Sequence, residues 1–185
     1  MKNIITLLVL VLGLVSCKKE ANQEASTDSL YQLDSKWENQ NGMTMKMADL
    51  KGKNTVMVMI YTSCKTACPR LTAEMRDIYR GVGQKDDVQY VLVSIDPKND
   101  TPETMKKYLE ANQFSGNQWV FLRSSEEDTR ELANVLAVKY KEISPMEFSH
   151  SNIITILDKS GNMLYQKEGL NVDVSETVKQ ISQLN

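Results

Sequence analysis

Long apolar runs alternate along this chain with stretches in which apolar residues recur at helical spacing, which predicts strands and helices in turn. Three runs are apolar at almost every position, as in strands buried on both faces, and cover residues 54–61, 88–95 and 119–122. Helical spacing follows each run and returns near the end of the chain, with predicted helices starting at Pro69, Thr101, Ser124 and Ser175. The runs 153–157 and 163–167 flank the turn 158–161 and predict a hairpin.

The predicted order is therefore strand, helix, strand, helix, strand, helix, hairpin, helix. Alternation of this kind is typical of an α/β sheet covered on both faces. A second hairpin is expected over 37–47, where Asn41-Gly42 supplies the turn. In the third helix, Ser124-Ser-Glu-Glu127 matches a capping box, and Leu132, Val135 and Leu136 are expected to face inward. We predict an α/β fold with a central mixed sheet flanked by helices and an N-terminal hairpin.

The start of the chain predicts export from the cytoplasm. A short basic lead precedes the apolar run 4–15, which is shorter than the roughly 20 residues that span a bilayer but suits a signal peptide. The run ends at Ser16-Cys17, which resembles the bacterial lipobox and implies that Cys17 is lipidated. An ordinary secretory signal is the alternative. We expect a signal peptide over 1–16, a flexible tether over 17–29, and one folded domain over 30–185.

Charge and cysteine content narrow the function. The formal net charge is -2 with mixed signs, so no basic surface is expected and nucleic acid is not a predicted partner. The chain has three cysteines, and lipidation of Cys17 would leave one pair in an oxidising compartment.

The remaining pair, Cys64 and Cys68, lies between a buried strand and a helix. This position narrows the α/β prediction to a thioredoxin-like architecture. The helix N-terminus stabilises negative charge, so both thiols are expected to ionise more readily than free cysteine. Spacing alone leaves three uses open, namely a structural disulfide, a redox couple and a metal site.

The single histidine, His150, precedes the strand 153–157 and is expected in a loop at the mouth of the sheet. In a thioredoxin-like fold that loop faces the cysteine turn, so Cys64, Cys68 and His150 can converge. Two thiolates and an imidazole form a soft ligand set that suits copper or zinc. Structural zinc generally needs a fourth protein ligand, and the sequence offers no second cysteine pair for it.

Taken together, these segments resemble the Sco/SenC family of membrane-tethered copper proteins with a thioredoxin fold. The resemblance runs through Asp49-Leu-Lys-Gly-Lys53, Cys64-x-x-x-Cys68-Pro69, the stretch 93–103 with Asp96-Pro-x-x-Asp100-Thr-Pro-Glu, and His150. It implies copper, Cu(I) or Cu(II), on Cys64, Cys68 and His150. It also implies delivery to an apo-cuproprotein such as subunit II of a respiratory oxidase, which carries a CuA centre. The protein would be a bacterial lipoprotein on the periplasmic side of a membrane.

Two positions depart from the family pattern and keep a second function open. Family members usually carry proline after the first cysteine, where this chain has Lys65, and many carry aspartate before the histidine, where it has Ser149. Lys65 favours a thiolate and disfavours Cu(II), which leans towards thiol chemistry or Cu(I). The alternative is thus a membrane-tethered thiol-disulfide oxidoreductase in which Cys64 attacks and Cys68 resolves.

Packing and turn formation account for the remaining candidate side chains. Methionines 57, 59, 75 and 105 are expected to fill the core, whereas Met43, Met45 and Met47 alternate on the first hairpin and could be partly exposed. Asp96 and Asp100 lie on the side where α/β folds place their sites, but turn and cap roles explain them equally well.

Overall fold

The computed structural model describes residues 29–171 and 173–184, and its elements follow the predicted order with one addition. The strands are β1 (Lys36–Asn39), β2 (Thr44–Lys46), β3 (Asn54–Ile60), β4 (Val88–Ser94), β5 (Trp119–Arg123), β6 (Tyr140–Ser144), β7 (Glu147–His150), β8 (Ile153–Leu157) and β9 (Met163–Glu168). The α-helices are α1 (Ala67–Val82), α2 (Pro102–Ala111), α3 (Glu126–Val135) and α4 (Ser175–Ser182), and short 3-10 helices cover Leu30–Gln32 and Met47–Leu50.

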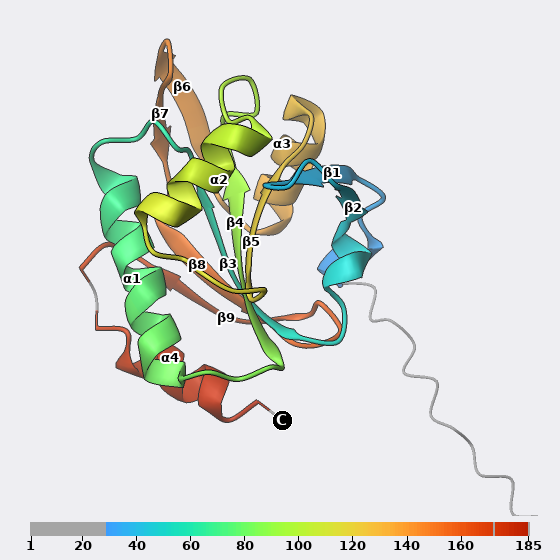
Figure 1. Ribbon diagram of the computed structural model, residues 1–185, viewed down its shortest axis with the longest axis vertical. Coiled ribbons are helices and arrows are strands. Elements are labelled where there is room, and N and C mark those ends of the chain that lie inside the picture. Colours follow the sequence, from blue (N-terminus) through green and yellow to red (C-terminus); the bar gives the residue numbers. More distant parts are fainter. Residues whose placement is uncertain (1–28, 172, 185) are drawn as a thin grey trace, which may run out of the picture.

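The main sheet is mixed and has the strand order β2-β1-β5-β4-β3-β8-β9. Strands β3, β4 and β5 are parallel, and the hairpin β8–β9 joins antiparallel beside β3. Helices α1, α2 and α4 lie on one face and α3 on the other (Figure 1). The predicted mixed sheet, its helical cover and the N-terminal hairpin are confirmed. Because β3 is central, the turn that follows it lies in the middle of one sheet edge.

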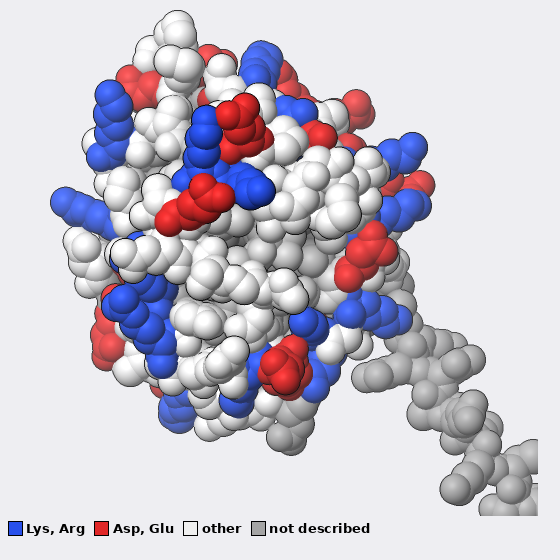
Figure 2. Space-filling view, viewed as in Figure 1, with Lys and Arg blue, Asp and Glu red and all other residues white. Residues whose placement is uncertain are grey.

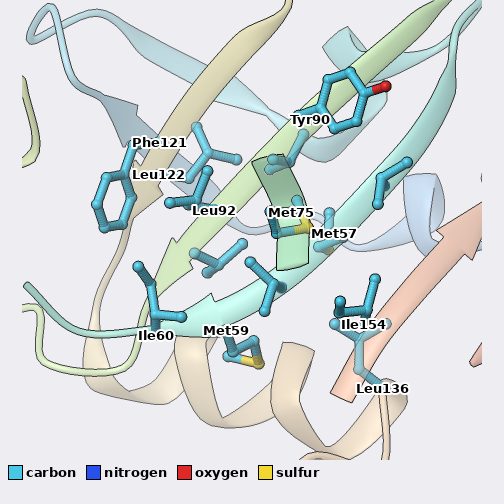
Figure 3. Close-up of a cluster of buried hydrophobic side chains, with 14 of the residues drawn as sticks. Met57, Met59, Ile60, Met75, Tyr90, Leu92, Phe121, Leu122, Leu136 and Ile154 are labelled. Carbon is cyan, nitrogen blue, oxygen red and sulfur yellow. The ribbon is translucent and has the colours of Figure 1, made fainter. Parts of the chain in front are cut away.

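The core lies on both faces of the central strands, as the apolar runs predict. Every residue of β3 and of β4 is buried, and Figure 3 shows side chains from these strands, β5, β8 and α1 packed together. The four methionines expected to fill the core, at 57, 59, 75 and 105, are each at most 2% exposed. Burial of a side chain of this size contributes about 1.5–3 kcal/mol, so the sheet is a firm platform for the turn at its edge.

Several helix boundaries differ from the predictions by one or two residues. Helix α1 begins at Ala67, so Pro69 is its third residue and not its first. The helix ends at Val82 and is followed by the C-cap residue Gly83, whose φ is +74°. Helix α3 is capped by Ser125, which accepts a hydrogen bond from the Asp128 amide, and not by Ser124. Val135 was expected to face inward but is 42% exposed, because it is the last residue of that helix and lies off its apolar stripe.

The hairpin β6–β7 was not predicted. It forms a separate two-stranded sheet that projects from the top of the molecule in Figure 1. Its strands are mostly exposed, so they carry no apolar pattern that marks them as strands. The prediction that His150 lies in a loop is therefore wrong, since it is the last residue of β7.

Lysine and arginine side chains are interspersed with aspartate and glutamate on the face seen in Figure 2. None of the helices formed within 29–171 and 173–184 has the length and apolar character needed to traverse a bilayer. The predicted signal peptide, the lipidation of Cys17 and nearly all of the tether fall on residues 1–28, outside the described residues.

Candidate metal centre

The turn between β3 and α1 brings the two cysteines together. Buried strand β3 ends at Ile60, and Cys64 follows in the turn with 8% of its surface exposed, while Cys68 in the first turn of α1 is fully buried. Thr66, at the N-cap position of α1, makes no side-chain capping bond. The sulfur of Cys64 takes that place, since it accepts the Cys68 amide hydrogen bond at 3.3 Å. The first turn of α1 therefore positions the Cys64 sulfur, and this sulfur in turn caps the N-terminus of the helix.

His150 reaches the same point from β7. Its Nε2 atom lies 3.5 Å from the Cys68 sulfur, and its Nδ1 atom lies 2.9 Å from the Ser151 carbonyl oxygen. Because a carbonyl oxygen can only accept, Nδ1 carries the proton and Nε2 turns its lone pair towards Cys68. The ligand atoms of Cys64, Cys68 and His150 all lie within 4.8 Å of one another. The predicted convergence of these three residues is thus present in the fold.

The two thiols have opposite acidities. The pKa of Cys64 lies well below its ordinary value because the Cys68 thiol and the backbone amides of Cys68 and Thr66 donate hydrogen bonds to its sulfur. The pKa of Cys68 is raised because its proton is held by Cys64 and because the group is buried. The expectation that both thiols ionise readily is therefore wrong for Cys68, which keeps the proton that its neighbour gives up.

Tyr61 connects the cysteine turn to the hairpin that carries His150. Its hydroxyl accepts the Phe148 amide hydrogen bond at 3.3 Å, and its ring meets those of Phe148 and His150 edge-on, with centroids 5.1 Å and 5.9 Å apart. Burial raises the pKa of this phenol, whose hydroxyl also lies against Cys64. A protonated hydroxyl at this place lowers the pKa of the Cys64 thiol, as a hydrogen-bond donor should.

Asp100 holds the first part of the cysteine turn in place through Thr62, a role that the sequence alone does not distinguish from helix capping. Its side chain is fully buried, accepts hydrogen bonds from the amide and the hydroxyl of Thr62, and accepts the Ser94 hydroxyl at 2.5 Å. Burial raises the pKa of this carboxyl, although those hydrogen bonds oppose the shift. The nearby Asp96 instead accepts a hydrogen bond from the side-chain amide of Asn99 at 2.9 Å, as expected of a turn residue.

The other sequence candidates lie away from this centre. Met43, in the turn before β2, is 58% exposed, as expected, whereas Met47 was expected to be partly exposed but is fully buried, because it begins the 3-10 helix that follows β2. In the sheet, β5 and β4 separate β1 from β3. Lys65 and Ser149, the two departures from the family pattern, are exposed next to their respective ligands.

The donor set suits a soft metal. Two thiol sulfurs and one imidazole nitrogen with a free lone pair lie within the reach of one ion, and thiolates favour Cu(I) while imidazole also suits Cu(II). The same pair, with one thiolate and one protonated thiol, also has the asymmetry of a nucleophile and a resolving group. The geometry thus supports copper binding and thiol exchange at one place.

Comparisons with known proteins agree on one family. The family model SCO1/SenC matches residues 20–184. A SCO1 protein homolog of Bacillus subtilis is 28% identical over 138 residues, which cover 72% of this chain and 72% of that protein. A SCO2-like protein of Rickettsia typhi is 25% identical over 132 residues, which cover 68% of this chain and 64% of that protein, so the chain spans less than two thirds of this relative.

Solved structures share the fold. A SCO1/SenC family lipoprotein from Bacillus anthracis superimposes with a TM-score of 0.75 at 25% identity, covering 83% of this chain and 95% of that one. BsSco, described as having a disulfide switch and as a member of the Sco family of cytochrome c oxidase assembly proteins, gives 0.69 at 27% identity, covering 85% and 97%. Bradyrhizobium japonicum ScoI with copper bound gives 0.70 at 24% identity, covering 82% and 97%, which shows the fold alone.

Proposed function

The chain belongs to the SCO1/SenC family, and from this premise we propose that it is a metallochaperone that binds copper through Cys64, Cys68 and His150. The observation that carries the proposal is the approach of the three ligand atoms to within 4.8 Å of one another. Copper is the cargo, and it is passed to an apo-cuproprotein by exchange of ligands. Copper bound to Bradyrhizobium japonicum ScoI is consistent with this choice of metal.

The side chains divide the work of binding. Cys64 is ready as a thiolate, whereas Cys68 releases its proton only when a cation or another electrophile takes its sulfur lone pair. His150 offers Nε2 while the Ser151 carbonyl fixes the other nitrogen, which sets the orientation of the ring. Cys64 is the more accessible sulfur, so exchange with a recipient begins there.

The recipient we propose is an oxidase subunit with a CuA centre, or a related extracytoplasmic cuproprotein. Support comes from BsSco, a member of a family of cytochrome c oxidase assembly proteins. The three-ligand site is also consistent with transfer, since a fourth position left to solvent or to a partner's ligand gives the recipient a point of entry.

The test is a copper titration of the reduced protein, followed by absorption and EPR spectroscopy. We expect about one copper per chain, with thiolate-to-Cu(II) charge-transfer bands in the oxidised form. Binding of Cu(I) with the same stoichiometry is expected, because both cysteine sulfurs are thiolates once the metal is bound and thiolates favour that ion. Failure to bind either ion at one equivalent would refute the proposal.

We further propose that the protein is anchored outside the cytoplasm through a lipid on Cys17, with residues 17–29 as a tether to a domain over 30–185. The sequence Ser16-Cys17 and the lipoprotein from Bacillus anthracis support this placement. A Cys17→Ser chain should move from the membrane fraction to the soluble fraction, because it lacks the cysteine that carries the proposed lipid anchor. Unchanged membrane association would contradict the anchor, and Cys17→Ser should leave copper stoichiometry as it was.

A second function, thiol-disulfide exchange, is favoured by the geometry of the cysteine pair: both thiols are free, and the Cys64 sulfur accepts the Cys68 amide hydrogen bond at the start of α1, which lowers the pKa of Cys64. The Cys64 thiolate attacks a partner disulfide, forms a mixed disulfide and releases one partner thiolate. Cys68 then loses its proton and attacks the Cys64 sulfur, which releases the second partner thiol and leaves a Cys64–Cys68 disulfide. This function needs no histidine.

A further inference from the structure

Arg130 of helix α3 holds the strand that lies opposite His150. We propose that Arg130 is a positioning residue, which acts through Tyr140 to keep the His150 imidazole facing Cys68. This role rests on the proposed function of His150 as a copper ligand. It assigns to Arg130 no contact with copper.

The position of His150 depends on β6 because, among the residues that the structure describes, β7 pairs with no other strand. Tyr140 is the direct partner of His150 in the register of this two-stranded sheet. Below this pair, the Ser151 amide donates to the Lys139 carbonyl at 2.8 Å and the Lys139 amide donates to the Ser151 hydroxyl at 3.2 Å. A displacement of Tyr140 is therefore transmitted across the ladder to His150.

Arg130 contacts both the backbone and the ring of Tyr140. Its Nη1 atom donates a hydrogen bond to the Tyr140 carbonyl oxygen at 3.0 Å. Its guanidinium carbon lies 3.8 Å from the centroid of the Tyr140 ring, which is the geometry of a cation–π contact. Leu132 and Ala133, at most 1% exposed, fix the same helix in the core. The contacts of Arg130 thus tie an exposed hairpin to a helix that is anchored in the core.

The hairpin is not closely packed against helix α3 where Arg130 and Tyr140 meet. A cavity of about 90 Å³ lies between the hairpin, helix α3 and the loop after β4, and Arg130, Tyr140, Glu142 and Phe148 are among its lining residues. Lys98 and Glu126 pair with each other at its rim, at 2.7 Å. Within the described part of the chain, no carboxylate oxygen lies within 4.0 Å of the Arg130 guanidinium, so its strongest contacts are those to Tyr140.

A second set of contacts holds the other strand of the hairpin. Tyr61 contacts Phe148, and the Ser63 hydroxyl donates to the Met146 carbonyl oxygen at 3.4 Å. These contacts remain without Arg130. Its loss should therefore increase the mobility of the hairpin but leave the hairpin packed against the cysteine turn. We therefore expect a limited effect on His150 and none on the cysteine pair.

The test compares Arg130→Met with Arg130→Lys, which keeps the charge, and with Arg80→Met as a matched control. Arg80 is an exposed arginine near the far end of α1 from Cys68. In Arg130→Met we expect Cu(II) affinity to fall about tenfold, with weaker nitrogen splitting in the EPR spectrum and Cu(I) affinity within about twofold of the parent. Arg130→Lys should recover part of the Cu(II) loss, and Arg80→Met should match the parent.

The copper-free protein supplies an independent readout. Hydrogen exchange at the amides of β6 and β7 should quicken several-fold in Arg130→Met, while exchange in β3 and β4 stays unchanged. Unchanged exchange in the hairpin, or equal loss of Cu(I) and Cu(II) affinity, would overturn the inference. If the parent bound no copper, the proposed function would fail, whereas the exchange result would still decide whether Arg130 holds the hairpin.

Discussion

His150→Ala is expected to weaken Cu(II) binding by about a hundredfold and to abolish nitrogen splitting in the EPR spectrum. The imidazole supplies the single nitrogen among the three ligand atoms that converge, and its Nε2 lone pair already faces the Cys68 sulfur at 3.5 Å. Cu(I) affinity should fall much less, because both thiolates remain and thiolates favour that ion. Competition titrations against a chelator of known affinity measure both values.

Measuring the reduction potential of the cysteine pair distinguishes loss of the imidazole ligand from disruption of the whole site in His150→Ala. The hydrogen bonds that lower the Cys64 pKa come from Cys68, Thr66 and Tyr61, so His150→Ala should leave the potential nearly unchanged. Ser149→Ala is the matched control, because Ser149 is an exposed neighbour in β7 that lies outside the ligand set. Cu(II) affinity equal to that of the parent in His150→Ala would remove His150 from the site.

Cys68→Ser should accumulate mixed disulfides with partner proteins if the second function operates, whereas Cys64→Ser should accumulate none. Cys64 carries the lowered pKa and the more accessible sulfur, so it makes the first attack, and a chain without Cys68 cannot resolve the adduct. Non-reducing electrophoresis of cells that express each variant, followed by mass spectrometry of the shifted bands, detects the adducts. The expected difference is all or none.

The reverse pattern, or no adduct with either variant, would argue against thiol exchange. A chain that lacks both cysteines is the control for adducts formed elsewhere. Because the trapping experiment does not involve His150, its outcome is independent of the copper titrations. The two functions can therefore be accepted or rejected separately.

Much of the fold could be predicted because its centre is simple. Strands β3 and β4 are buried at every position, and an unbroken apolar run of that length is typical of a strand covered on both sides. The hairpin β6–β7 escaped prediction for the opposite reason. Four of the five residues in β6 are exposed, so solvent imposes no pattern on them, and the strand exists because β7 and Arg130 hold it.

The candidate site likewise has features that the sequence predicts and features that it does not. Its three candidate ligand residues follow from residue type and from the resemblance to a family, but the acidities of the two thiols do not. Proximity to a helix N-terminus predicts a low pKa for both thiols, whereas the fold buries Cys68 fully and lets its thiol donate to the Cys64 sulfur, which raises the pKa of Cys68. The role of Asp100 likewise cannot be predicted from the sequence, since only its burial and its hydrogen bonds from Thr62 distinguish it from an ordinary turn aspartate.

Helix α1 begins on a sulfur atom where most helices begin on an oxygen, because Cys64 accepts the amide hydrogen bond that the side chain of Thr66 leaves open. Whatever withdraws electron density from that sulfur, whether a metal or a second sulfur, also weakens the first bond of the helix. The strength of the hydrogen bond from the Cys68 amide therefore differs between a free, a metal-bound and an oxidised Cys64 sulfur.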